Sequence, residues 1–252
     1  MSNKQRQDLI LDLLEKQGYV TVKYLTELLH YSSATINRDL NALEGRGLVV
    51  RSYGGVEPVR ARYVPVLFRS HRMHVEKNRI GKAAAELVKD GDTIFIDGST
   101  TAQCMGQYLV GRKNLTVVTN NMALATSLGE YEIRVICLGG TVVEAPSMLG
   151  GHVTAENAAK YKVDKMFFST EAVTSEGQIA TGLYDMVFRA LMKNGCQRFY
   201  LVDHKKIDLP VHQMLCTFEE IDSVISDHTF PEATQARYPN TRFVTVSDQE
   251  SK

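Results

Sequence analysis

The sequence predicts an α/β protein of two domains: a small helical domain with a β-hairpin, then a larger domain built on a mostly parallel sheet with helices on both faces. Three observations predict this. Leucines recur at helical spacing in the first 45 residues, short apolar runs alternate with helical segments after residue 78, and basic residues gather between the two patterns. A chain of 252 residues can bury one small and one medium core. We place the domains at 1–58 and 78–252, with a basic linker at 59–77.

The first domain is predicted to begin with three helices. Residues 4–16 carry apolar side chains at helical spacing, and Gly18 suits the left-handed position that ends a helix. Thr21 is a good N-cap for a second helix, and Ser33 for a third that continues to about Glu44. Two short helices joined by a tight turn form the helix-turn-helix pattern.

The third helix has the residue types that read base edges in a DNA major groove. Small residues at its start let it approach the bases closely, and its first backbone amides can bind a phosphate. Asn37 and Arg38 can make the two-pronged contacts that read adenine and guanine. Asp39 is expected to position Arg38 or to cap backbone groups, because phosphates repel a carboxylate. The candidate DNA-binding residues of this segment are Ser32, Ser33, Thr35, Asn37 and Arg38.

A β-hairpin is predicted after the third helix. Strands at 48–53 and 56–59 flank a pair of glycines, which suits a tight turn. This wing places Arg51 and Tyr53 to contact the sugar-phosphate backbone or a minor groove, so both are candidate DNA-binding residues. A three-helix protein-interaction module is the alternative, and the wing makes it the weaker one.

The segment 60–82 carries a local excess of positive charge within a chain of zero net charge. One acid, Glu76, stands against seven basic residues: Arg60, Arg62, Arg69, Arg72, Lys77, Arg79 and Lys82. Such a cluster is typical of a phosphate-facing surface. A solvated linker that needs charge for solubility explains the cluster equally well.

These N-terminal residues resemble the DNA-binding domain of the DeoR family of repressors. The resemblance covers 4–56 and is strongest over 33–44, which reads SATINRDLNALE. The family usually has arginine where this chain has Asn37, and histidine where it has Tyr53. The resemblance therefore implies the fold and binding to double-stranded operator DNA, but not the operator sequence.

The second domain is predicted to alternate strands with helices. The strands are expected at 93–97, 115–119, 133–138, 165–168, 199–202 and 223–225. The helices are expected at 80–88, from 98 to about 109, at 120–128, and near 154–160 and 185–195. Apolar runs of four to six residues separated by helices indicate a largely parallel sheet covered on both faces.

Polar turns follow the carboxyl ends of these strands, where ligands bind in such sheets. Gly98 lets a ligand approach the backbone, and hydroxyl side chains follow it beside unpaired amides at a helix N-terminus. Lys206, after another strand, can pair with a phosphate. Each turn alone can be a simple helix cap, but four on one sheet edge favour a ligand site. The candidate effector-binding residues are Asp97, Gly98, Ser99, Thr100, Thr101, Asn120, Gly139, Gly140, Glu171 and Lys206.

This part resembles the DeoR-family sensor domain, which is similar to the folds of ribose-phosphate isomerases, glucosamine-phosphate deaminases and CoA-transferases. The matching pieces include 97–101, 118–120, 138–140, 164–167, 201–203 and Lys206. The resemblance implies a transcriptional repressor of a sugar-catabolism operon, controlled by a phosphorylated sugar or related metabolite. The chain departs from the family at 168–172 and at Gly182 and Asp185. Glu171 is therefore either a ligand hydroxyl acceptor or a solvated turn residue.

The alternative from another class is a sugar-phosphate isomerase or deaminase with an accessory N-terminal domain. Asp97 and Glu171 would then serve as acid and base beside a bound sugar. Among the ligand turns only His204 offers an imidazole, and the DNA-reading pattern is complete. We therefore expect a regulator with no catalytic residue and no cofactor.

Composition limits the remaining possibilities. No apolar run has the roughly 18–20 residues that cross a bilayer, and the N-terminus has no signal-peptide pattern, so we expect a cytoplasmic protein without a membrane partner. The four cysteines lack paired spacing, which favours buried reduced thiols over a metal site or disulfide. A homo-oligomer, dimer or tetramer, would present paired reading helices to a repeated operator.

Overall fold

The computed structural model describes residues 2–17, 19–52, 54–58, 73–144, 148–181, 185–209 and 213–247. The chain divides into two compact units between His74 and Val75, and each unit is described by itself below. Within the described residues, no helix is both long enough and apolar enough to cross a membrane.

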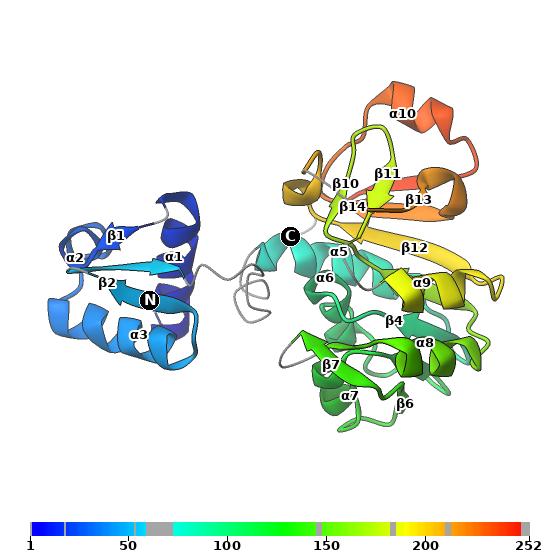
Figure 1. Cartoon of the computed structure of the whole chain (residues 1–252), viewed down its shortest axis with the longest axis horizontal. Coiled ribbons are helices and arrows are strands. Elements are labelled where there is room, and N and C mark those ends of the chain that lie inside the picture. Colours follow the sequence, from blue (N-terminus) through cyan, green and yellow to red (C-terminus); the bar gives the residue numbers. More distant parts are fainter. Residues whose placement is uncertain are drawn as a thin grey trace. The chain divides into compact units, whose positions relative to one another are not determined.

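The described residues of the first unit form helices and a small antiparallel sheet (Figure 1). Its helices are α1 (Asn3–Gln17), α2 (Val22–Leu29) and α3 (Ser33–Gly45). Its strands are β1 (Val20–Thr21), β2 (Val49–Ser52) and β3 (Gly55–Pro58), in the order β1-β3-β2. The apolar faces of the helices share one core, which includes Ile10, Leu14, Leu25, Ile36, Leu40, Leu43, Leu48 and Val56. The predicted helix-turn-helix with its wing is confirmed.

Hydroxyl side chains cap the second and third helices. Thr21 accepts a hydrogen bond from the amide of Tyr24 at 3.0 Å, as predicted. The predicted cap of α3 is wrong by one residue. Ser32 is the N-cap, since its extended backbone lets its Oγ accept from the Thr35 amide at 3.3 Å, while Ser33 is already helical. Strand β1 was not predicted, because two residues are too few to show an alternating pattern.

The second unit is organised around a seven-stranded parallel sheet with the strand order β15-β14-β12-β9-β4-β5-β6. The strands are β4 (Thr93–Ile96), β5 (Thr116–Thr119), β6 (Arg134–Cys137), β9 (Lys165–Phe168), β12 (Gln197–Val202), β14 (Ser223–Ser226) and β15 (Arg242–Thr245). The six predicted strands are all present in it, and β15 is an addition. The carboxyl ends of β12, β9, β4 and β5 therefore lie next to one another.

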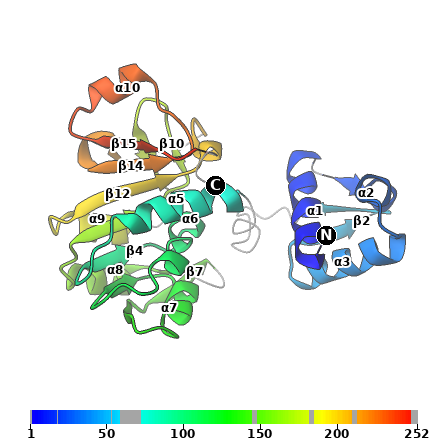
Figure 2. The ribbon, with the colours of Figure 1, turned by 180° about the vertical axis from the view of Figure 1, so that it is seen from behind.

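Helices cover both faces of this sheet, as the apolar runs predicted. The helices are α5 (His74–Glu86), α6 (Thr100–Gln103), α7 (Met122–Leu128), α8 (His152–Ala159), α9 (Asp185–Met192) and α10 (Glu232–Arg237). Single 3-10 turns lie at η1 (Gly106–Tyr108), η2 (His204–Lys206) and η3 (Phe218–Glu220). Figure 1 shows α8 and α9 on one face, and Figure 2, from behind, shows α5 and α6 on the other.

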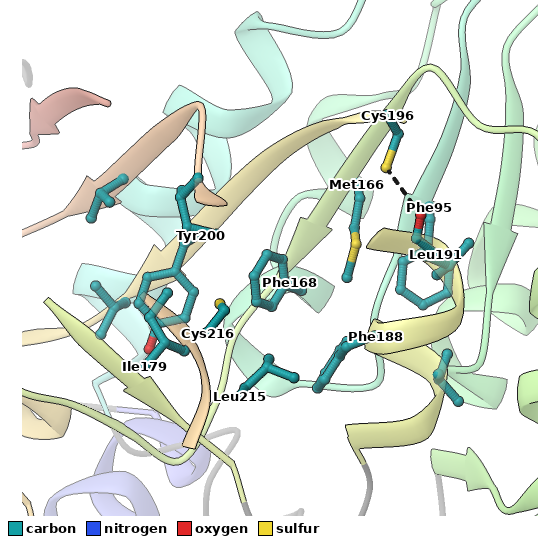
Figure 3. Packing of buried hydrophobic residues seen from close by; sticks show 14 of the residues in the cluster. Phe95, Met166, Phe168, Ile179, Phe188, Leu191, Cys196, Tyr200, Leu215 and Cys216 are labelled. Carbon is teal, nitrogen blue, oxygen red and sulfur yellow. Dashed lines mark hydrogen bonds between the residues drawn. The ribbon is translucent and has the colours of Figure 1, made fainter. Parts of the chain in front are cut away.

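Each face has its own core because side chains alternate along every strand. Ile94 and Ile96 pack with α5, α6 and α7, whereas Phe95 packs with α8 and α9. On that second face Phe168 lies between Phe188 and Tyr200, with ring centroids 5.3 Å and 5.4 Å away (Figure 3). The sheet is therefore rigidly held on both sides, and its carboxyl edge is left for polar groups.

Two smaller sheets were not predicted. Strands β7 (Thr141–Glu144) and β8 (Met148–Gly150) form an antiparallel hairpin after β6. Strands β10 (Ala172–Val173), β11 (Gln178–Ala180) and β13 (Met214–Thr217) form a three-stranded sheet in the order β10-β11-β13. All of these strands have two to four residues, which is too short for a reliable pattern.

Two predicted helix bounds are corrected. Helix α5 begins at His74 rather than near residue 80, so the last residues of the predicted linker, 74–77, are helical. The helix expected to continue to about Leu109 ends at Gln103 and is followed by η1. Its continuation is broken at Cys104 and Met105, which close tighter turns onto Thr101 and Ala102.

Candidate functional site

Helix α3 has one buried apolar stripe with polar side chains beside it. Ile36, Leu40 and Leu43 are buried, so Asn37 and Arg38, which follow Ile36, face away from the core. Arg38 is exposed, and its Nε donates to the Ala34 carbonyl at 3.4 Å, along the outermost stripe. The predicted reading residues Ser32 and Ser33 are exposed at the start of the helix, and Thr35 is half-buried beside them.

Arg51 of the wing lies against α3. Its Nη2 donates to the Asn37 side-chain oxygen at 2.8 Å, to the Asn41 side-chain oxygen at 3.1 Å and to the Asn37 carbonyl at 3.3 Å. Its backbone amide also donates to Glu44 at 3.3 Å. From the sequence, Arg51 was predicted to contact the sugar-phosphate backbone or a minor groove. In this structure its guanidinium joins the wing to α3. Tyr53, the other predicted wing residue, lies outside the described residues.

Asp39 was expected to position Arg38 or to cap backbone groups, and the structure shows a different role. Asp39 is buried, and both of its oxygens accept hydrogen bonds from the guanidinium of Arg6 on α1. Gln7 adds a bond of 3.5 Å to the same carboxylate. The pairing raises the pKa of Arg6, so the charge is held firmly. Asp39 therefore fixes α3 against α1.

The basic segment is only partly described. Arg60, Arg62, Arg69 and Arg72 lie outside the described residues, and the remaining three bases lie on α5. Lys77 is buried, and its Nζ donates to the Thr100 hydroxyl at 3.1 Å, so it is not part of an exposed DNA-facing surface. The described basic residues of this segment therefore differ in their surroundings, although they are close together in the sequence.

The start of α6 brings two lysines to neighbouring hydroxyl groups. Ser99 is the N-cap and accepts from the Ala102 amide at 3.1 Å, so its role as a simple cap is real. Thr100 receives the bond from Lys77, and Thr101 receives one of 3.4 Å from Lys206. Buried hydroxyls beside two ammonium groups form a cationic cradle, which we call the α6 seat (Lys77, Ser99, Thr100, Thr101 and Lys206).

Asp97 lies at the base of the α6 seat. It is 2% exposed, and burial raises its pKa to about 7. The Ser99 hydroxyl, which donates to Asp97 Oδ1 at 2.6 Å, and the charge of Lys206 oppose that rise. The carboxyl group therefore changes its protonation state near neutral pH, inside a site that otherwise carries positive charge.

Several polar residues on the same sheet edge were not predicted as site residues. Lys206 donates to the Ser169 hydroxyl at 2.7 Å, and the Thr170 hydroxyl bonds the Tyr200 hydroxyl at 2.8 Å. Ser169 and Thr170 directly follow β9, the neighbour of β4, so the rule about strand ends could have found them. Lys77 gave no such signal, because it lies on α5, which precedes β4, the first strand of the parallel sheet along the chain.

The sequence suggested that Gly98 lets a ligand approach the backbone, but Met148 occupies the space beside Gly98. A β-carbon built there would overlap the Cγ and Sδ of Met148 on β8. Asn120 holds that strand in place: its Nδ2 donates to the Leu149 carbonyl at 2.8 Å, and its own carbonyl accepts from the Leu149 amide at 2.8 Å. Asn120 thus fastens the β7–β8 hairpin to the edge of the sheet and is not shown contacting the α6 seat.

The remaining candidates lie apart from these contacts. The Gly139–Gly140 turn is fastened to α8, where Thr154 donates to the Gly139 carbonyl at 2.8 Å and a β-carbon at Gly140 would overlap Thr154. Both glycines have positive φ angles, 69° and 117°, which explains their identity without a ligand. Glu171 is exposed.

No group of three or more His, Cys, Asp or Glu side chains among the described residues could hold a metal ion. The four cysteines are free. Cys196 and Cys216 are buried, as expected, and burial raises the pKa of the Cys216 thiol to about 12. Cys137 is exposed at the end of edge strand β6, so the expectation of burial is wrong there.

A helix-turn-helix with a wing, joined to a sheet domain with a polar seat at its carboxyl edge, defines a DNA-binding regulator with a separate sensor domain. Comparison with protein families agrees with this class. Residues 6–61 match the DeoR-like helix-turn-helix domain, and residues 72–228 match the DeoR C terminal sensor domain. The chain belongs to the DeoR family of transcriptional repressors.

Similar proteins extend over nearly the whole chain. The glycerol-3-phosphate regulon repressor of Escherichia coli is 30% identical over 90% of this chain and 92% of its own length. The HTH-type transcriptional repressor GlcR of Bacillus subtilis is 31% identical over 99% and 94%. The lactose phosphotransferase system repressor of Staphylococcus aureus is 28% identical over 90% and 93%.

Solved structures give weaker similarities. Ribose 5-phosphate isomerase A from Methanocaldococcus jannaschii is 19% identical, with a TM-score of 0.40 over 54% of this chain and 55% of its own. The eIF2B delta subunit from Chaetomium thermophilum is 18% identical, with a TM-score of 0.46 over 83% and 77%. Similarities at this level carry no argument about function, and the strand order already defines the fold.

Proposed function

We propose that this protein is a cytoplasmic repressor that binds operator DNA through α3. Its affinity for the operator falls or rises when a phosphorylated sugar or related metabolite occupies the α6 seat. The observation that carries the effector half is the convergence of Lys77 and Lys206 on adjacent threonines. Two ammonium groups and several hydroxyls suit the charge of a phosphate group and its hydrogen-bond acceptors. The names of the relatives, a glycerol-3-phosphate regulon repressor among them, support the same ligand class.

The DNA half rests on the exposed side of α3. Its first turn carries small residues, and Arg38 stands on the outermost stripe with its guanidinium free to reach past Ala34. We propose that Ser32, Ser33, Thr35, Asn37 and Arg38 lie in the major groove, with Tyr53 near the backbone. A homo-oligomer would present two such helices to a repeated operator.

The effector proposal is tested with Lys206→Met in the full-length chain. Binding of ribose 5-phosphate, glucosamine 6-phosphate, glycerol 3-phosphate and their unphosphorylated counterparts is measured by calorimetry, and operator binding by fluorescence anisotropy with and without each compound. We expect the wild type to bind at least one phosphorylated compound, and Lys206→Met to lose about tenfold or more in that affinity while keeping operator binding.

Lys205→Met is the matched control. Lys205 is the neighbouring residue and is exposed, so its loss removes the same charge without touching Thr101 or Ser169. Equal losses in both variants would show a general charge effect and contradict the seat. Wild-type protein that binds none of the phosphorylated compounds would contradict the effector class.

The DNA proposal is tested with Arg38→Ala. An operator is first obtained by selecting fragments from randomised DNA with the wild-type protein. We expect the variant to lose about 1–3 kcal/mol of specific binding while its circular dichroism spectrum and effector binding stay unchanged. An unaltered footprint on the selected operator would contradict the assigned reading face.

We further propose that the chain catalyses no sugar-phosphate conversion. An isomerase or deaminase would need an acid and a base facing one ligand, and the two candidates differ sharply: Asp97 is buried and Glu171 is exposed. Turnover of ribose 5-phosphate or glucosamine 6-phosphate by the purified protein, abolished in Glu171→Gln, would contradict this.

A further inference from the structure

The wing residue Arg51 fixes which way the side-chain amide of Asn37 faces. A guanidinium group only donates hydrogen bonds, so the group that meets it must be an acceptor. The bond of 2.8 Å from Arg51 Nη2 therefore identifies the Asn37 atom as Oδ1 and removes the usual ambiguity between the oxygen and nitrogen of an amide. The Nδ2 amino group of Asn37 must then point away from Arg51.

The same guanidinium holds a second amide on the same face of α3. Asn41 is one helical turn after Asn37, and its Oδ1 accepts from the same Nη2 at 3.1 Å. The Asn37 carbonyl adds a third contact at 3.3 Å. Three acceptors around one nitrogen atom make rotation of the Asn37 side chain costly, because it would turn the two hydrogens of Nδ2 toward the cation.

Asn37 remains available on its other side. It is half-buried, next to the exposed Arg38 and one position after the core residue Ile36. Among the residues that the structure describes, no acceptor is bonded to its Nδ2. An oriented amino group therefore stands at the edge of the surface that α3 presents.

We infer that Arg51 is a positioning residue, and that Asn37 reads the operator as a hydrogen-bond donor. Its partner would be an acceptor on a base edge: a purine N7, guanine O6 or thymine O4. The two-pronged adenine contact needs Oδ1 and Nδ2 to face the base together, and the bond from Arg51 holds Oδ1 toward the wing, which disfavours that arrangement. This inference rests on the proposed placement of α3 in the major groove.

The inference is tested by base preference rather than affinity alone. Full-length wild type, Asn37→Asp and Arg51→Met each select sites from randomised DNA, and binding constants are then measured on the wild-type site and on its single base-pair variants. Asn37→Asp keeps the acceptors that meet Arg51 but removes the donor. Arg51→Met keeps the amide but frees it to rotate.

We expect both variants to change preference at the same base pair. Asn37→Asp should lose about fivefold or more in discrimination there, and Arg51→Met should shift the preference toward adenine, whose two-pronged contact the freed amide can make, with other positions retained. Arg51→Lys keeps a donor-only cation on the wing and should preserve much of the wild-type preference. Thermal unfolding of each variant checks that the domain is folded.

Arg46→Met is the matched control. Arg46 follows the last turn of α3 and donates to Gln7 at 3.3 Å, so its loss removes the same charge from the same domain without touching Asn37. We expect unchanged base preferences. Should Arg46→Met shift the same base pair as Arg51→Met, charge rather than orientation would be responsible and the inference would fail.

Three further outcomes separate this inference from the proposed function. If Arg51→Met weakens binding equally on all DNA and lowers its salt dependence, Arg51 is a phosphate contact and the inference is overturned. If Asn37→Asp alters no preference while Arg38→Ala does, α3 reads DNA without Asn37, and only the inference is overturned. A wild type that selects no preferred sequence would overturn the proposed placement of α3 and the inference with it.

Discussion

Met148 lies directly on Gly98, so the hairpin β7–β8 covers the first turn of the α6 seat. Hydrogen bonds between Asn120 and Leu149 hold the hairpin there. The space above the Asp97–Ser99 turn is therefore limited by one flexible apolar side chain. We expect a ligand larger than a phosphate group to pack against Met148 or to displace it.

Shortening that side chain should change which compounds bind. Met148→Ala leaves room above Gly98, so we expect it to accept bulkier phosphorylated sugars than the wild type, measured by thermal shift over a series of triose, pentose and hexose phosphates. Val142→Ala, at an exposed position of β7, is the control and should leave the series unchanged. An unaltered order of ligands in Met148→Ala would show that the hairpin does not limit the seat.

Lys77 should matter for effector binding despite its distance in sequence from the sheet. Its buried ammonium group donates to Thr100, and Lys77→Met removes that charge from the seat. We expect about tenfold weaker binding of the effector found for the wild type, with operator affinity retained. Lys82→Met removes an exposed charge from the same helix and should have little effect. Equal losses in both variants would exclude a specific role for Lys77.

The Arg6–Asp39 pair should stabilise the DNA-binding domain. Removing one partner of a buried ion pair leaves an uncompensated charge, so Asp39→Ala is expected to cost about 3–5 kcal/mol in the free energy of unfolding of residues 2–58. Glu176→Ala breaks the exposed pair with Arg237 in the second unit. We expect it to cost less than about 1 kcal/mol in the free energy of unfolding of that unit. Chemical denaturation followed by circular dichroism measures both. A loss below about 1 kcal/mol in Asp39→Ala would contradict the structural role.

Asp97 should make the sensor domain less stable as the pH rises. Its pKa is about 7 in the folded chain against 3.8 for the free group, so the folded state holds the proton more tightly. Stability from this group is full below about pH 4, falls between about pH 4 and 7, and is constant above. Urea unfolding at about pH 5 and pH 8 should differ by on the order of 2 kcal/mol, and Asp97→Asn should lack that difference. The same difference in both proteins would contradict the raised pKa.

Much of the fold is readable in the sequence because its elements are long or strongly patterned. The leucines of α1 recur at helical spacing, and β4, β5 and β9 are short continuous apolar runs. The helical domain and the sheet could therefore be predicted. The hairpin β7–β8 could not, because its strands have four and three residues, which is too short to show an alternating pattern.

The residues of the α6 seat that follow strands were among the predicted ligand residues, whereas Lys77, which follows no strand of the sheet, was not. Thr100, Thr101 and Lys206 follow β4 and β12, and the structure brings them together. Lys77 lies on a helix before the first strand, so only the packing of α5 against α6 reveals it. Gly139 and Gly140 were assigned to the ligand as one of the polar turns at the sheet edge, but the group beside Gly140 is Thr154.

The separate cores of the two units imply two different kinds of loss of regulation. The α6 seat is assembled from residues after β4 and β12 and from α5, so a missense change in the packing of that sheet should disturb the seat while leaving the cluster around Ile10 and Leu40 intact. Cells carrying such an allele should no longer respond to the effector. Changes around Leu40 or Asp39 should instead leave the operon constitutively expressed. The position of a mutation along the chain, on either side of residue 74, should thus sort spontaneous mutants by phenotype before any protein is purified.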